Sequence, residues 1–124
     1  MNLATAKQNL VYGRSMKHAS NEARLLYFVA YEICDSSGIF DVTYALDTYK
    51  LPMAALTELV EAKLLLYFED QGTAVIIHWN IIATANQRGK ASLFPEAKNR
   101  LFTKNGKYYL KNYDSDNTDV IYMN

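Results

Sequence analysis

The stretch from Pro52 to Trp79 constrains the fold most, because a helical pattern in it runs directly into two strand-like segments. Apolar side chains recur at spacings of three and four from Met53 to Leu64, and Pro52 lies where a first helical turn tolerates a missing N–H. Two β-branched and aromatic runs follow, from Leu65 to Phe68 and from Ala74 to Trp79. The pattern therefore predicts a helix that leads straight into a pair of strands.

A turn signal separates the two strand-like runs. It reads Glu69-Asp70-Gln71-Gly72, and Gly72 can adopt the positive φ that a tight hairpin requires. A helix followed by a two-stranded wing is the second half of a winged helix-turn-helix. The residues before Pro52 should then supply the first half.

The preceding residues contain the elements that this topology needs. Ser20-Asn21-Glu22 is a helix start signal, with a capping side chain and an acidic residue in the first turn. The segment from Ala23 to Cys34 is apolar nearly all round, which predicts a buried central helix that stops at Asp35 to Gly38. Ile39 to Val42 is a short strand candidate with which the wing can pair, and Thr43 to Thr48 a short helix. The predicted fold class is α+β, a winged helix-turn-helix with a three-helix core and a small antiparallel β-wing.

The pattern after Trp79 is looser. A helical turn at Asn80 to Asn86 and a loop at Gln87 to Lys90 are expected, and Ser92 to Phe102 has the Pro95 signal of a short helix. Asn105-Gly106 is a turn dipeptide, so a second small hairpin around it is the competing interpretation. We expect four parts: an N-terminal arm (1–19), a winged-helix domain (20–80), a basic aromatic extension packed on it (81–112) and an acidic tail (113–124).

The formal net charge of zero hides a strong segregation of charge along the chain. Residues 1–78 hold six basic and nine acidic side chains, residues 79–112 hold seven basic and one acidic, and the last twelve hold three acidic. Phosphate binding depends on the local potential and not on the total charge. The basic block is therefore a candidate surface for a polyanion.

Size and composition indicate one globular domain. The chain has 124 residues, of which half are hydrophobic, enough for a core but short for two domains. It lacks the apolar run of a membrane span and the apolar block of a signal peptide, so we expect a cytoplasmic protein, in the bacterial host cytoplasm if phage-encoded. The single cysteine, Cys34, is expected to be a reduced, buried and inert thiol.

No pattern in the sequence predicts catalysis. His18 and His78 lack companions at metal-ligand spacing, and a Gly-rich phosphate loop is absent. We therefore expect a protein that is not an enzyme and that has neither a metal site nor a cofactor. Carboxylates such as Glu58 and Glu61 are expected to do no more than solvate a helix face.

The helix after Pro52 is poorly suited to reading bases in the major groove. Such a helix usually offers Arg, Asn, Gln or Lys, whereas the polar face of this one carries Glu58 and Glu61. The basic extension interleaves cations with aromatic rings, which suits duplex backbone or single strands, although a solvated face with its rings packed under the wing is the plain alternative. The candidate DNA-binding residues are Thr48, Tyr49 and Lys50 before the helix, Gln71 and Thr73 in the wing, and Arg88, Lys90, Lys98, Arg100, Lys104 and Lys107 in the extension.

Three stretches carry a resemblance to a known family. Ala23 to Phe28 with Asp35 to Phe40, the strand ending in Ile77-His78-Trp79-Asn80, and Asn86 to Lys90 with Ser92 and Glu96 together resemble the N-terminal domain of phage replisome organisers. These are DnaD-related replication-initiation proteins of phages of low-GC Gram-positive bacteria. The resemblance implies a winged-helix fold, origin DNA binding, self-association and contact with a helicase-loader or primosome protein.

Two other functions remain open. A protein-interaction or oligomerisation module on a winged-helix frame, without direct DNA readout, is favoured by the acidic helix and by ten tyrosines, a residue enriched at interfaces. A winged-helix transcription regulator would share the fold, but its recognition helix would be expected to carry Arg or Asn. If the chain is instead a replisome-organiser module, its expected partners are DNA, single or double stranded, and a second copy of the chain.

Overall fold

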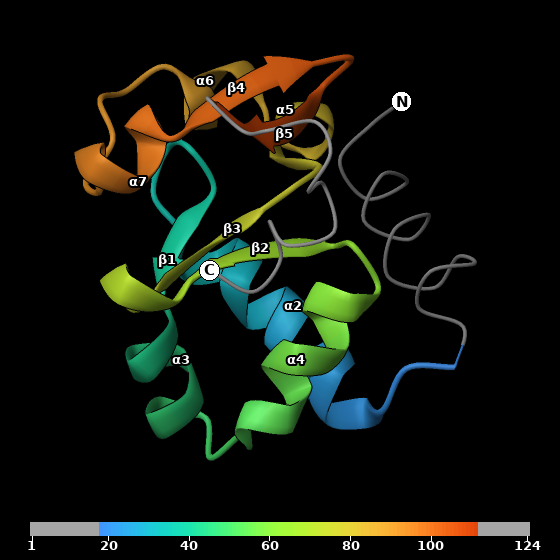
Figure 1. Cartoon of the computed structure of the whole chain (residues 1–124). Helices are drawn as coiled ribbons and strands as arrows, with labels where there is room; N and C mark the ends of the chain where they lie inside the picture. Colours follow the sequence, from blue (N-terminus) through green and yellow to red (C-terminus); the bar gives the residue numbers. More distant parts are fainter. Residues whose placement is uncertain (1–17, 112–124) are drawn as a thin grey trace.

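The structure is a computed structural model that describes residues 18–111, and it has an α+β fold with a small antiparallel sheet (Figure 1). The acidic tail and all but the end of the N-terminal arm lie outside the described residues. The elements are α2 (Asn21–Ile33), β1 (Ile39–Asp41), α3 (Val42–Thr48), α4 (Met53–Glu61), β2 (Leu65–Phe68), the 3-10 helix η2 (Glu69–Gln71), β3 (Thr73–Ile76), α5 (Trp79–Ile82), α6 (Ala85–Arg88), α7 (Pro95–Asn99), β4 (Leu101–Lys104) and β5 (Lys107–Leu110).

Helix α2 begins at the predicted signal. The Ser20 side chain accepts a hydrogen bond of 3.1 Å from the backbone N–H of Ala23, and the helix ends at Ile33, just before the predicted stop. Its buried face packs against α3, α4 and β1. The helix is therefore buried on several sides, as predicted, while Leu25 is 45% exposed.

The sheet has the strand order β1-β3-β2, and both pairings are antiparallel. Between β2 and β3, Gly72 adopts a φ of +65°, as the turn signal predicts. Strand β3, predicted to run to Trp79, is shorter than expected. It ends at Ile76, because Ile77 and His78 form a turn and Trp79 already begins α5. The observed order from α2 to β3 is helix, strand, helix, helix, strand, strand, as predicted.

Residues 79–111, here called the C-terminal layer, form the short helices α5, α6 and α7 and the β4–β5 hairpin. The hairpin interpretation is confirmed: α7 ends at Asn99, and the chain then turns back at Asn105-Gly106, both with positive φ. In Figure 1 the layer lies at the top, on the far side of the sheet from α3 and α4.

One core joins the layer to the rest of the molecule. The buried cluster includes side chains of the helices and the sheet together with Trp79, Ala97, Leu101, Tyr108 and Leu110 of the layer. The backbone N–H of Tyr108 also donates a 3.0 Å hydrogen bond to the carbonyl of Ile77, just after β3. Within residues 18–111, no helix has the length and apolar character needed to cross a membrane.

Candidate nucleic-acid interface

The carboxylate of Asp35 anchors the C-terminal layer to the loop after α2. Its Oδ1 accepts from the backbone N–H groups of Ser37 and Ile39 at 2.8 and 3.0 Å, and its Oδ2 accepts from the Ser92 hydroxyl at 2.5 Å and the Leu93 N–H at 2.9 Å. Asp35 is only 8% exposed. Hydrogen bonds to a carboxylate are stronger than neutral ones, and burial adds to their weight. The loop that precedes α7 is therefore held in place.

A second contact at the same loop involves Trp79, which is 2% exposed. Its indole N–H donates a 2.8 Å hydrogen bond to the carbonyl of Ser36, and the Ser36 hydroxyl donates a 2.6 Å bond to the carbonyl of Lys90. Gly38 has a φ of +83°, and a Cβ there would lie 2.6 Å from Cγ of Trp79. Asp35 to Gly38 were predicted only as a helix stop, and their contacts with Trp79 and Lys90, which dock the layer, were not predicted.

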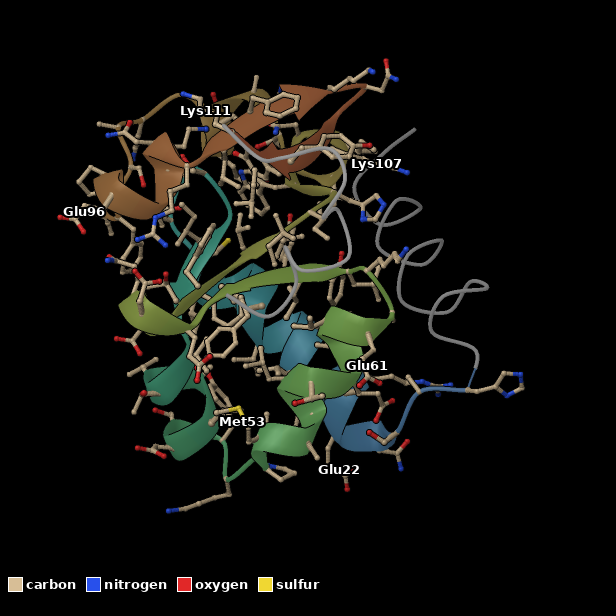
Figure 2. The ribbon with its side chains drawn as sticks, in the orientation of Figure 1. Glu22, Met53, Glu61, Glu96, Lys107 and Lys111 are labelled. Atoms are coloured by element: carbon tan, nitrogen blue, oxygen red, sulfur yellow. The ribbon has the colours of Figure 1, made fainter. Side chains whose placement is uncertain are left out.

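The docked layer carries most of the positive charge of the described chain. It holds seven basic side chains and one acidic one, whereas residues 18–78 hold three basic and nine acidic side chains. Figure 2 shows Lys107 and Lys111 in the upper part of the molecule, at the hairpin and just after it, whereas Glu22 and Glu61 lie in the lower part. The exposed cations of the layer are Arg88, Lys90, Lys104, Lys107 and Lys111.

Two candidate cations of the layer are already engaged within the molecule. The Lys98 ammonium donates to the Tyr108 hydroxyl at 3.1 Å and lies 4.9 Å from the centre of the same ring. The Arg100 guanidinium binds both carboxylate oxygens of Asp70, at 2.9 and 2.6 Å, and covers the ring of Phe68. Because these contacts compete with a ligand, Lys98 and Arg100 are weaker phosphate candidates than the exposed lysines.

The candidates outside the layer lie elsewhere. Thr48 ends α3, and Tyr49 and Lys50 lie in the turn that follows; all three are exposed, and Figure 1 shows this turn at the far end of the molecule from the hairpin. Gln71 is exposed on η2, between β2 and β3. Thr73 is 5% exposed, because it begins the central strand and pairs with neighbours on both sides. Its burial argues against a DNA contact.

Glu58 does more than solvate a helix face, contrary to the expectation from its position. Its carboxylate accepts from the Ser20 backbone N–H at 2.7 Å and from the Ser20 hydroxyl at 2.9 Å. The start of α2 is thus bound to α4, where an acceptor complements the helix dipole. Glu61 remains exposed on α4 and keeps that helix acidic.

Two titratable side chains near the layer favour their neutral forms. Burial raises the pKa of the Cys34 thiol to about 12, with a further contribution from Asp35, so the thiol stays protonated at neutral pH. The thiol is half-buried, not fully buried as expected. Burial and then the charge of Lys107 lower the pKa of His78. Among residues 18–111, no cluster of three or more His, Cys, Asp or Glu side chains is arranged to hold a metal ion.

The Asp70–Arg100 ion pair gives a testable dependence on pH. Its hydrogen bonds to Arg100 lower the pKa of Asp70 from 3.8 to about 2. The pair therefore stabilises the fold at pH values above about 4, and this contribution disappears as the pH falls towards 2. We expect Asp70→Asn to unfold at a lower urea concentration than the parent at neutral pH, and the two midpoints to converge near pH 2. Since both side chains are exposed, high salt should shrink the difference; a gap that persists in acid would contradict the assignment.

Comparisons of the chain with protein-family models, with curated proteins and with solved structures gave no match. Three features of the molecule bear on its function: the position of the cations, the contacts that fix the layer, and the acidic side chains on the part of the molecule away from the hairpin.

Proposed function

We propose that this chain is a DNA-binding replication-initiation module, of the replisome-organiser type, built on a winged-helix frame. The observation that carries the proposal is the basic C-terminal layer, which has seven cations and one carboxylate, has five of those cations exposed, and is held by hydrogen bonds to the buried Asp35. Phosphate chains bind such surfaces through charge neutralisation and counterion release.

The frame supports the winged-helix part of the proposal. Helices α2, α3 and α4 precede a hairpin of β2 and β3, and β1 completes the sheet on the other side of β3. This order of elements is that of a winged helix-turn-helix. Moreover, the residues on which the family resemblance rests meet in space, since Trp79 contacts the loop that contains Asp35 and Gly38.

We propose that DNA lies along the layer and not along α4. Helix α4 presents Glu61 to solvent, and the turn before it carries the cation Lys50. DNA bound against α4 would therefore be attracted by Lys50 and repelled by Glu61. The layer instead presents Arg88, Lys90 and the two lysines of the hairpin tip. Binding of this kind depends on phosphates and is expected to be steeply dependent on salt.

The opposite end supports a second role in contacting a protein. Tyr44, Tyr49 and Met53 are 54%, 42% and 51% exposed there, and tyrosine and methionine are enriched at protein interfaces. Met53 also lines an apolar hollow of about 180 Å³ between α4 and β2. We propose this end as the site for a helicase-loading partner; the same observation favours the alternative, an interaction module that does not bind DNA.

Charge reversal at the hairpin tip tests the DNA proposal. We expect the double variant Lys104→Glu, Lys107→Glu to lower duplex affinity roughly tenfold or more. The slope of log affinity against log salt should also become shallower, by the amount that corresponds to the loss of about two phosphate contacts. Lys50→Glu, at the far end of the molecule, is the control and should change affinity little. Fluorescence anisotropy of a labelled random duplex at two salt concentrations measures both quantities.

The control separates the competing functions. If Lys50→Glu weakens binding and the double reversal does not, DNA lies against the α3–α4 turn, as in a helix-turn-helix regulator. If the unaltered protein binds no DNA at low salt, the interaction module is the better assignment. Far-UV circular dichroism should be unchanged in all variants, because these lysines are exposed.

A further inference from the structure

The two faces of the β4–β5 hairpin differ sharply in exposure. Phe102 pairs with Tyr109 and Lys104 with Lys107, and directly opposed residues of an antiparallel pair lie on the same face. All four of these side chains are exposed. The opposite face contributes the buried side chains of Leu101, Tyr108 and Leu110 to the core, and on it Thr103 alone of the strand residues is exposed.

Two aromatic rings form the middle of the exposed face. The Phe102 and Tyr109 rings are stacked, with centroids 5.6 Å apart and planes inclined by 27°, and the residues are 42% and 38% exposed. Lys104 and Lys107 lie next to the rings on the tip side. On the other side, Lys111 donates its backbone N–H to the carbonyl of Arg100, which continues the ladder by one pair. On β5, Tyr109 therefore lies between Lys107 and Lys111, whereas on β4 Phe102 is followed by Lys104 and preceded by Arg100, whose guanidinium is bound to Asp70.

We infer that this face, here called the ring platform, binds a single-stranded polynucleotide by stacking bases on Phe102 and Tyr109 while the flanking lysines hold the phosphates. The inference rests on the proposed DNA-binding function and specifies its ligand. Bases of a duplex are already stacked on each other, so a ring on a flat surface can reach only unpaired bases. Rings with flanking cations are the combination that binds single strands with little regard to sequence.

The platform is rigid enough for this role. Tyr108 lies between Lys107 and Tyr109 in the sequence and points to the inner face. It is 2% exposed, and its backbone N–H donates a 3.0 Å hydrogen bond to the carbonyl of Ile77. Its hydroxyl also accepts a hydrogen bond from Lys98. The hairpin is thus fixed through its inner face, while the rings of the outer face stay exposed in the part of the molecule that the structure describes. For the same reason, the rings can be replaced without removing core contacts.

Fluorescence anisotropy with labelled oligonucleotides tests the platform. The probes are oligothymidylate and oligouridylate of about 12 nucleotides, within the range of small single-strand sites, and a random duplex. We expect Phe102→Ala and Tyr109→Ala each to lower affinity for both single strands roughly tenfold and to leave duplex affinity within about twofold. Phe102→Leu should behave like Phe102→Ala, because both variants lose the aromatic ring, although leucine keeps a large apolar side chain. Tyr109→Phe keeps the ring and should keep the affinity.

Each contrary result has a distinct meaning. Unchanged single-strand affinity in the ring variants, or equal losses on single strands and duplex, overturns the platform; the DNA-binding function then stands or falls with the lysine reversals. Loss on one of the two single strands alone also overturns it, since stacking does not distinguish the sugars. If light scattering shows that the ring variants dissociate a dimer while affinity for oligonucleotides is retained, the face is a self-association surface. Absence of any binding by the unaltered protein overturns both proposals.

Discussion

Replacing Gly38 by alanine is expected to lower the free energy of unfolding by about 3 kcal/mol, for two separate reasons. The φ of +83° is unfavourable for any residue with a Cβ. In addition, the new methyl group would lie 2.6 Å from Cγ and 2.7 Å from Cβ of Trp79, a buried ring that has little room to move. Urea unfolding followed by the fluorescence of Trp79, the single tryptophan, measures the loss.

Gly72 supplies the matched control. It also has a positive φ, +65°, but within residues 18–111 no atom beyond its two chain neighbours lies within 4 Å of the position that its Cβ would take. Gly72→Ala should therefore cost only the backbone strain, about 1 kcal/mol. If both substitutions cost the same, the indole yields to the methyl group, and the close fit of Trp79 over Gly38 contributes nothing to stability.

Replacing Asp35 by alanine is expected to cost about 4 kcal/mol, because four donors lose a common charged acceptor. The two on the layer side, from Ser92 and Leu93, should also release the chain before α7. We therefore expect faster proteolytic cleavage between residues 88 and 95 in addition to the lower urea midpoint. Mass spectrometry of the first cleavage products identifies the bond that is cut.

Asp41→Ala is the control for the loss of an aspartate. Asp41 is exposed, and its side chain caps α3 with one hydrogen bond, of 2.9 Å, to the N–H of Tyr44. Loss of such a cap costs about 1 kcal/mol and should leave the cleavage pattern unchanged. Equal effects of the two substitutions on stability and cleavage would show that Asp35 does not hold the layer.

The parts of the fold that the sequence predicted are those with strong local signals. Ser20 marks the start of α2 through a contact three residues away, and Gly72 marks the turn between β2 and β3 through its own φ. The contacts that sequence reasoning missed join distant residues: Glu58 to Ser20, and Asp35 to Ser92, 57 positions apart. A single carboxylate in a turn gives no sign of which distant donors it will meet.

The candidate interface was predictable in charge but not in shape. The run of cations after Trp79 is plain in the sequence, whereas the inward position of Thr73 and the pairing of Arg100 with Asp70 depend on tertiary packing. The ring platform did have a signal. Arg100, Phe102 and Lys104 alternate with other residues at a spacing of two, which is typical of a strand with one exposed face. The predicted short helix from Ser92 to Phe102 overlapped with this pattern and competed with it.

The separation of charge between the two ends has a consequence for how the molecule approaches its ligand. In the described part of the chain, residues 18–78 carry a net charge of −6 and residues 79–111 a net charge of +6, although Asp35 and Asp70 of the acidic part lie at the contact with the layer. The field around a phosphate chain exerts a torque on such a charge distribution before contact, so encounters should be oriented with the hairpin leading. The tyrosine-bearing end would then point away from the nucleic acid, where a second protein can reach it.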